Sequence, residues 1–435
     1  MLIIHNEELR RRIRSDARYT LREIQRIRTL LEDKGTFEFS ALANGLFPAA
    51  RVNKETEYTG YANVWVRDNI HVAHAHYAVG DTETAAKNVN ALMTFFRKYQ
   101  RRFKDAIESG VAPKDPMKRP HIRFNGQRLV ENRGTWAHAQ NDALGYFLWF
   151  CATLANQEII EIHRKEMNML ALFALYFKTI RYWEDEDSGH WEETRKICAS
   201  SIGVVVAALR ELQQLLRKTG FECKYKNESV APMLAQLINN GKKSLRRILP
   251  RECIQDESSK KRRYDAALLF LIYPLQVVGQ PVADRILGDV TDNLQGDYGI
   301  RRYIGDSFWA PDYKKKLPPE RRTSHCGYDI SSRDALLATK GGEAQWCIFD
   351  PIISVIYGTR FQKTGNEDFL DKQIHHLNRS LGQITEEFEC PELYYIEDNQ
   401  YVPGDVVPLL WTQANLRIAL KIMEQSLQST TSKTE

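Results

Sequence analysis

Several short segments combine acidic, basic and aromatic side chains within a few residues of one another. In the run WVRDN at 65–69, Arg67 and Asp68 set a guanidinium beside a carboxylate, and such groups can together bind neighbouring hydroxyl groups. An ordinary ion pair at the start of a helix would have the same sequence pattern. In TWAHAQND at 135–142, the flat indole of Trp136 precedes amide and carboxylate groups, although Trp136 by itself is also compatible with core packing.

A third segment is strongly acidic. The run YWEDEDSGHWEE at 182–193 holds six acidic side chains and two tryptophans. Mutual repulsion and desolvation by an adjacent indole both raise the pKa of a carboxyl group, and a carboxylic acid that stays protonated can donate its proton in catalysis. The alternatives are an acidic surface loop and a calcium loop, but the spacing of an EF-hand is absent.

A fourth candidate is a glutamate in an aromatic loop. Glu392 lies in PELYY at 391–395, shortly before an amphipathic helix that begins near Trp411 in PLLWTQA. The aromatic surroundings suit a carboxylate that works in a pocket, whereas an isolated glutamate here would be an exposed loop charge.

Two further patterns are not expected to carry chemistry. His71, His74 and His76 form H-x-x-H-x-H, but no H-E-x-x-H accompanies them and the third histidine points away from the face of the other two. No metal site is therefore expected. Cys198 opens CASSIG, which lacks the glycines of the nucleophile turn G-x-S-x-G, so this run is expected to begin a helix.

The composition fits a large globular protein. The 435 residues are 43% hydrophobic and 27% charged, which excludes disorder and allows a sizeable core. No stretch approaches 18 consecutive apolar residues, so no membrane span is expected. The net charge of +5 is mild and basic runs such as 242–247 lack interleaved aromatic residues, so we expect no nucleic-acid partner. Seven scattered cysteines without a C-x-x-C pair favour reduced thiols and a cytoplasmic location.

Apolar residues at helical spacing predict about a dozen helices, and no run shows the alternation of a strand. We expect one amphipathic helix over 6–34, and a later helix that Asp81 caps. Long connections rich in tryptophan and tyrosine separate the helices, which suggests a site where these loops converge. The other predicted helices lie at 66–79, 138–155, 157–180, 199–217, 228–246, 264–274, 280–293, 344–362, 366–384 and 409–426, and the long connections at 46–65, 110–137, 181–198, 295–342 and 386–408.

Taken in this order, the motifs resemble the catalytic domain of family 15 glycoside hydrolases, the glucoamylases and their relatives. They equally resemble the homologous domain in the α and β regulatory subunits of phosphorylase kinase, and ASSIG at 199–203 and PELYY favour that branch. The matching positions cover most of the chain: Trp65-x-Arg67-Asp68, Trp136-x-x-x-Gln140-Asn141-Asp142, Trp183-Glu184, Arg302-Tyr303, Glu392 and Pro408-Leu409-x-Trp411.

The resemblance implies an all-α fold, the (α/α)6 toroid of six helical hairpins, with the site at its loop-bearing end. We expect this domain at 51–428, with an N-terminal helical segment at 1–50 packed on it and a frayed tail at 429–435. The chain ends just after the toroid and shows no starch-binding domain, so we expect a free-standing enzyme that acts on soluble substrate.

The resemblance also implies roles. Glu184 would be the general acid and Glu392 the general base of an inverting, exo-acting α-glucosidase that removes terminal α-linked glucose from a soluble oligosaccharide or glucan. Such hydrolysis needs no cofactor. The alternative is a glucan-binding or regulatory protein with little or no hydrolysis. Beyond Arg302-Tyr303, the 296–342 region matches nothing in the family. The residues expected to bind the substrate are Trp65, Arg67, Asp68, Trp136, Asn141, Asp142, Trp183, Asp185, Arg302, Tyr303 and Trp411.

Overall fold

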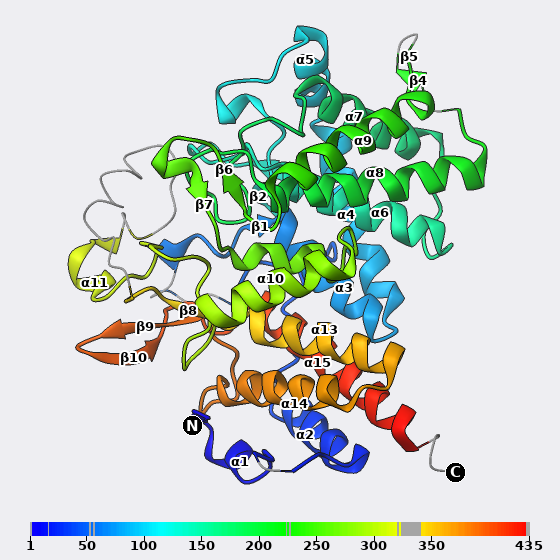
Figure 1. Cartoon of the computed structure of the whole chain (residues 1–435). Helices are drawn as coiled ribbons and strands as arrows, with labels where there is room; N and C mark the ends of the chain where they lie inside the picture. The colour runs from blue at the N-terminus through cyan, green and yellow to red at the C-terminus, as the bar shows by residue number, and fades with distance from the viewer. Residues whose placement is uncertain are drawn as a thin grey trace.

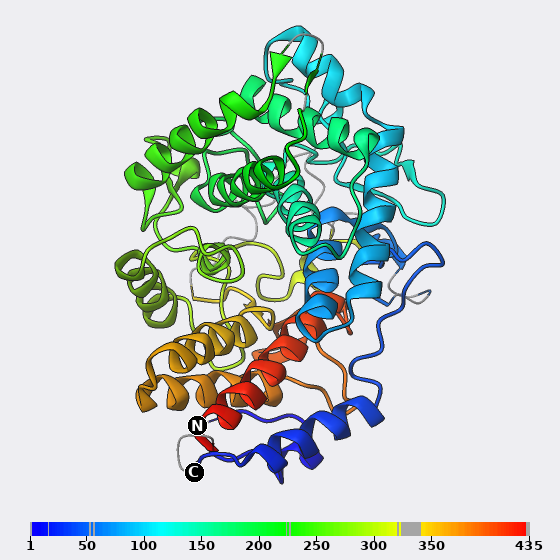
Figure 2. The ribbon, with the colours of Figure 1, turned by 90° about the vertical axis from the view of Figure 1, so that its right-hand side faces the viewer.

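The computed structural model describes the chain except residues 1, 16, 52–53, 55–56, 223, 226–227, 320–321, 323–340 and 432–435. Twelve of the described helices form six pairs, each with one helix in an inner ring and one in an outer ring (Figures 1 and 2). Five pairs are hairpins of consecutive ring helices, and the sixth pairs helices from the two ends of the chain. The inner helices pack each against the next and the last packs against the first, so the ring is closed. The predicted all-α (α/α)6 toroid is confirmed. In hairpin order, inner before outer, the members are α3 (Val66–Ala78) with α4 (Thr82–Lys98), α6 (Asn141–Asn156) with α7 (Arg164–Thr179), α8 (Ala199–Thr219) with α9 (Ala231–Ile248), η4 (Ala266–Leu271) with α10 (Gln280–Asn293), α13 (Phe349–Thr364) with α14 (Glu367–Gly382), and α15 (Leu410–Thr431) with α2 (Leu21–Asp33).

The inner ring consists of α-helices except at one position. The short 3-10 helix η4 stands where a longer helix over 264–274 was predicted, and all six of its residues are buried. A run of apolar side chains with no polar face predicts burial but does not distinguish a full helix from a single short turn.

The N-terminal segment differs from the single helix expected over 6–34. Asn6 caps the one-turn helix α1 (Glu7–Arg10), and α2 begins anew at Thr20, whose side chain forms a capping box with Glu23. A capping box satisfies the first free N–H groups of a helix, so it defines a new start inside the amphipathic pattern. Because α2 then pairs with α15, it belongs to the outer ring, and both chain ends lie at the same end of the molecule in Figure 2.

Other predicted boundaries agree more closely. Asp81 caps α4 through a bond from the Thr84 N–H, as expected, but the helix ends at Lys98 and a separate α5 (Arg101–Ser109) follows. At the other end of the chain, α15 continues to Thr431, and the remainder of the expected tail, 432–435, lies outside the described residues. The division of the chain at residue 50 stays a prediction.

The long connections contain short strands that the sequence did not predict. Side-chain alternation cannot be recognised over two to five residues, so such strands are invisible to it. In Figure 1, β6–β10 and the one-turn helix α11 (Tyr313–Lys316) gather on one side of the molecule. The strands are β1 (Val64–Trp65), β2 (Arg123–Asn125) and β3 (Val130–Glu131) in one sheet, β8 (Gln345–Trp346), β9 (Leu393–Glu397) and β10 (Gln400–Pro403) in a second, and the pairs β4 (Lys224–Tyr225) with β5 (Glu228–Ser229) and β6 (Cys253–Ile254) with β7 (Lys261–Arg262).

These strands fix residues that the loops carry toward one another. Antiparallel pairing sets Trp65 of β1 opposite Arg123 of β2, and Trp346 of β8 opposite Leu393 of β9. A tight turn through Asp398 and Asn399, both in the left-handed region, closes the β9–β10 hairpin. Among the described residues, every helix is too short or too polar to span a lipid bilayer.

The backbones of α6 and α8 approach each other closely at Gly145. A Cβ there would lie 2.9 Å from Val204 Cγ1 and 3.2 Å from the Val205 nitrogen. We predict that Gly145→Ala lowers the free energy of unfolding by about 1–3 kcal/mol, because two inner helices must separate to admit the methyl group. Urea unfolding followed by circular dichroism measures the change.

The matched control is Gly288→Ala on α10, where the nearest atom to an added Cβ is Asp292 Oδ2 at 4.0 Å. This substitution should raise the free energy of unfolding by about 0.4–1 kcal/mol, because it only restricts the unfolded chain. Equal effects of the two variants would contradict the close helix approach.

Candidate active site

A pocket of about 890 Å³, its open mouth included, lies where the loops of the ring converge. Aromatic side chains dominate its wall, and charged groups of both signs stand among them. The aromatic lining residues are Tyr61, Trp65, Trp136, Trp191, Phe308, Trp309, Trp346 and Trp411, and the charged ones are Arg67, Asp68, Glu192, Arg302, Arg322 and Glu392.

Glu392 enters the pocket just before β9. Its backbone is fixed on both sides, since its N–H donates to the Val406 carbonyl (3.1 Å) and its carbonyl accepts from the Cys347 N–H (2.9 Å). The Tyr61 hydroxyl donates to Glu392 Oε1 at 2.8 Å. Burial raises the pKa of Glu392 to about 8, against the opposing effects of the Tyr61 hydrogen bond and the charge of Arg302. The carboxyl group is thus held in place and close to a neutral-pH protonation change.

Glu192 enters the same pocket from the acidic 182–193 segment. Its Oε1 accepts from the Trp65 indole N–H at 2.8 Å and from the Gln140 amide at 3.1 Å, and an Arg67 nitrogen lies 3.6 Å away. The Glu192 backbone has φ +59°, in the left-handed region that non-glycine residues rarely adopt. Strain of this kind persists where the surroundings impose it, and it occurs often at functional sites.

Glu184, the expected acid, lies elsewhere. It lies in the turn beyond the end of α7, forms an ion pair with Arg181 at the surface, and has a side chain that is 40% exposed. Its neighbour Trp183 packs edge-on against Tyr182 and does not line the pocket. The structure therefore does not bring Glu184 and Glu392 together, and this expectation has to be corrected.

The Trp-Glu pattern occurs twice in the acidic segment, eight residues apart. Only the second copy, Trp191-Glu192, lies in the pocket wall. The repetition itself was the signal that both copies had to be considered, and the contacts of the fold decide between them.

Asp185 and Asn141 lie behind the wall. Arg119 grips the Asp185 carboxylate with two nitrogens at 2.6 and 2.9 Å, and the Asn141 amide donates to it at 3.0 Å. The Asn141 N–H donates to Asp187 at 2.8 Å. These residues join the acidic segment to the start of α6, so they position the pocket wall from outside it.

Arg67 and Asp68 both line the pocket at the start of α3. Arg67 donates to Asp142 Oδ2 at 2.6 Å and to the Gln140 side chain at 3.0 Å, so Asp142 holds the guanidinium from behind. Burial raises the pKa of Asp68 to about 7, despite the opposing charge of Arg67. The two neighbours thus present a fixed cation and a titratable acid to a ligand.

Arg302 lines the pocket, and Asp306 orients it through two hydrogen bonds of 2.6 and 2.7 Å. Its guanidinium lies 4.6 Å from the ring centre of Trp346. Tyr303 instead lies behind the wall, where its hydroxyl donates to Glu193. The charges of Arg262, Lys196 and Arg302 hold the pKa of Glu193 well below its ordinary value, although burial acts the other way.

Two more expected binding residues, Trp65 and Trp136, meet edge to face with ring centres 5.7 Å apart. Arg123 lies against both, 4.6 and 4.0 Å from their ring centres, and donates to the Gly60 carbonyl at 3.3 Å. Arg123 therefore braces the indole that holds Glu192, and also the chain beside Tyr61, which holds Glu392.

Trp411 is the last expected binding residue, and it stacks on His71 at 4.3 Å in the wall. The pocket residues that sequence reasoning missed include Tyr61, Trp191, Glu192, Phe308, Trp309, Arg322 and Trp346. Apart from the repeated Trp-Glu pattern, no sequence signal marks them, because they belong to loops that meet only in the folded ring.

A sequence model of the family described as "Glycosyl hydrolases family 15" matches residues 33–306. The chain belongs to this family. Its relatives include the probable phosphorylase b kinase regulatory subunits alpha of Caenorhabditis elegans and Drosophila melanogaster, each 25% identical, over 83% and 85% of this chain. The chain spans only about 30% of the length of either relative.

Solved structures of glycosidases and glucoamylases share the fold. A glycosidase variant in complex with glucose is 17% identical with a TM-score of 0.66, and covers 92% of this chain and 98% of its own. The glucoamylase of Saccharomycopsis fibuligera is 11% identical with a TM-score of 0.60, covering 95% and 99%. A bacterial glucoamylase complexed with acarbose is 14% identical with a TM-score of 0.58, covering 88% and 53%.

The buried Arg67–Asp142 pair gives a test of the site's framework. We predict that Asp142→Asn lowers the free energy of unfolding by about 3–5 kcal/mol, because it leaves the Arg67 charge buried without its closest partner. The control is Glu184→Gln, which breaks the exposed pair with Arg181 and should change stability by less than about 1 kcal/mol. Denaturant titration of the three proteins measures both, and a Glu184→Gln loss as large as that of Asp142→Asn would contradict these placements.

Proposed function

We propose that the protein is an inverting, exo-acting α-glucosidase that hydrolyses terminal α-linked glucose from a soluble oligosaccharide or glucan. Glu192 is the general acid and Glu392 the general base. The observation that carries the proposal is that these two carboxyl groups line one aromatic pocket and are each held by hydrogen bonds from that pocket's own wall.

The hydrogen bonds on each carboxyl group support different roles for the two, with Glu192 as the acid and Glu392 as the base. In these roles Glu192 protonates the glycosidic oxygen, and two N–H donors hold its Oε1 in place. Glu392 takes a proton from a water molecule as that water attacks the anomeric carbon from the opposite face. The bond from this carbon to the leaving oxygen breaks, the proton from Glu192 completes the leaving hydroxyl group, and the product has the inverted anomeric configuration.

The wall suits a glucose unit. Flat indoles such as Trp65 and Trp136 offer stacking surfaces for a sugar ring, while Arg67 and Asp68 supply a donor and an acceptor side by side. Related structures contain glucose in one case and acarbose in another. The five described cysteines are buried and unpaired by disulfides, which fits the cytoplasmic location expected from the sequence.

The decisive measurement is proton NMR of the purified protein with maltose, maltotriose, isomaltose and trehalose. We expect β-glucose to appear first from one of these α-linked substrates. Glu192→Gln and Glu392→Gln should each lower kcat by about 10²–10⁴-fold, because each removes one proton-transfer group.

Glu184→Gln is the matched control, since it makes the same change at the other Trp-Glu position and should keep wild-type turnover. Circular dichroism confirms that each variant is folded. Loss of activity in Glu184→Gln but not in Glu192→Gln would restore the first assignment, and α-glucose as the first product would exclude inversion.

The pKa of Glu392 predicts the pH dependence. A general base works only when ionised, so the active fraction rises with pH through the pKa of that base. Because the pKa of Glu392 is raised from 4.5 to about 8, we expect the ascending limb of kcat/KM to lie well above pH 4.5. Tyr61→Phe removes a donor that favours the ionised form, so it should move this limb to still higher pH.

Tyr401→Phe, in β10 and outside the pocket, is the control and should leave the limb unchanged. An ascending limb near pH 4.5, or one that Tyr61→Phe does not move, would show that Glu392 is not the base.

The second candidate is a glucan-binding or regulatory protein with little hydrolysis. The observation that favours it is the match to two regulatory subunits over more than four fifths of this chain. If the NMR assay detects no hydrolysis while calorimetry still detects maltooligosaccharide binding to the wild type, this second function is the better one.

A further inference from the structure

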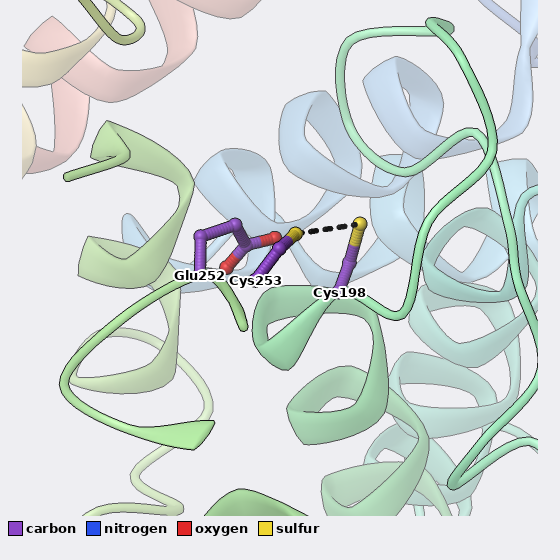
Figure 3. A group of neighbouring side chains, drawn as sticks. All are labelled: Cys198, Glu252 and Cys253. Carbon is purple, nitrogen blue, oxygen red and sulfur yellow. Dashed lines mark hydrogen bonds between the residues drawn. The ribbon is translucent and has the colours of Figure 1, made fainter. Parts of the chain in front are cut away.

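A cluster of two thiols and a carboxyl group lies outside the pocket, between α8 and the β6–β7 hairpin. Cys198 immediately precedes α8, and Glu252 and Cys253 lie at the start of β6 (Figure 3). All three side chains are buried, and one donor atom from each lies within 4.8 Å of the other two. The two sulfur atoms are 3.9 Å apart.

This geometry matches one edge of a tetrahedral metal site. Two thiolates that each bind zinc at about 2.3 Å lie about 3.8 Å apart when the angle between them is tetrahedral. A disulfide bond would instead bring the sulfurs to about 2.05 Å. We propose that Cys198, Cys253 and Glu252 bind a thiophilic divalent cation, Zn²⁺, as a structural site separate from the sugar pocket.

The charges around the cluster favour a cation. The Glu252 side chain lies at the N-terminus of α8, where it accepts from the Ser200 N–H (3.0 Å) and hydroxyl (2.5 Å). Asp187 lies close enough for its charge to act on Cys198, and its Oδ1 is buried without a hydrogen-bond partner among the described residues.

The neighbouring basic side chains are engaged elsewhere. Arg262 pairs with Glu193 at 2.7 Å and with Asp265 at 2.9 Å. Lys196 donates to the Thr194 carbonyl at 2.8 Å. Neither pairs with Glu252, so a bound cation would supply the positive charge that this buried group of acids lacks.

The site would brace the loop that carries the proposed acid. Cys198 ends the connection 181–198, which contains the acidic segment. Within this connection, Asp187 and Lys196 are joined by two backbone hydrogen bonds of 3.0 and 2.9 Å. Cys253 is paired across the β6–β7 hairpin with Arg262, which holds Glu193. A metal ion between the two sulfurs would therefore fix the hairpin to the Glu192–Glu193 loop.

Metal content of the full-length wild-type protein tests the proposal directly. Protein produced with added zinc, and purified without chelators, should carry one zinc per chain by mass spectrometry of the metal. Protein produced with Co²⁺ should show thiolate-to-cobalt charge-transfer absorption. Cys198→Ser and Cys253→Ser should each lose the metal, and Glu252→Gln should retain less of it.

Cys151→Ser is the matched control, because Cys151 is an equally buried thiol on α6 outside the cluster, and it should keep one metal per chain. If the serine variants fail to fold, alkylation of the wild type decides: Cys198 and Cys253 should react only after a chelator is added. Folded wild type without bound metal, or a Cys198–Cys253 disulfide found by peptide mass spectrometry, would overturn the proposal.

Discussion

Arg67 is the charge on which the pocket depends. A buried guanidinium is tolerated only where acids surround it, and Asp142 and Glu192 lie 2.6 and 3.6 Å from its nitrogens. Through these contacts, one residue at the start of α3 joins α6 and the acidic segment. The pocket can then hold further carboxyl groups, because Arg67 and Arg302 offset part of their mutual repulsion.

The pocket also depends on the toroid, because the closed ring brings the loops that carry the pocket residues together. Residues 61, 192, 302 and 392 are far apart in the chain, and they meet because each belongs to a connection on one side of a closed ring. The helices themselves contribute little to the pocket wall beyond their first turns. Packing between inner helices, closest at α6 and α8, therefore determines how precisely the loops can meet.

Sequence patterns predicted the elements well where one residue's neighbours along the chain decide its structure. Apolar spacing predicted the ring helices, and Asp81 predicted the start of α4. The motifs around Arg67 and Glu392 identified segments that reach the pocket. The pattern over 6–34 failed because Thr20 and Glu23 cap a second helix inside one continuous stripe. Tyr61 and Trp346 were missed because the contacts that place them run between distant loops.

The acidic segment shows why composition alone could not identify the acid. Its six carboxyl groups are similar in sequence, but each takes a different partner in the fold, and a carboxylate fully engaged by cations is poorly suited to hold a transferable proton. Glu193 is excluded by its three basic neighbours, and Glu184 by its place at the surface. Glu192 alone among the six reaches the pocket wall, where its Oε1 accepts from an indole and an amide and lies 3.6 Å from an Arg67 nitrogen. The other partners are Arg181 for Glu184, Arg119 for Asp185, Lys260 for Glu186, the Asn141 N–H for Asp187 and Arg262 for Glu193.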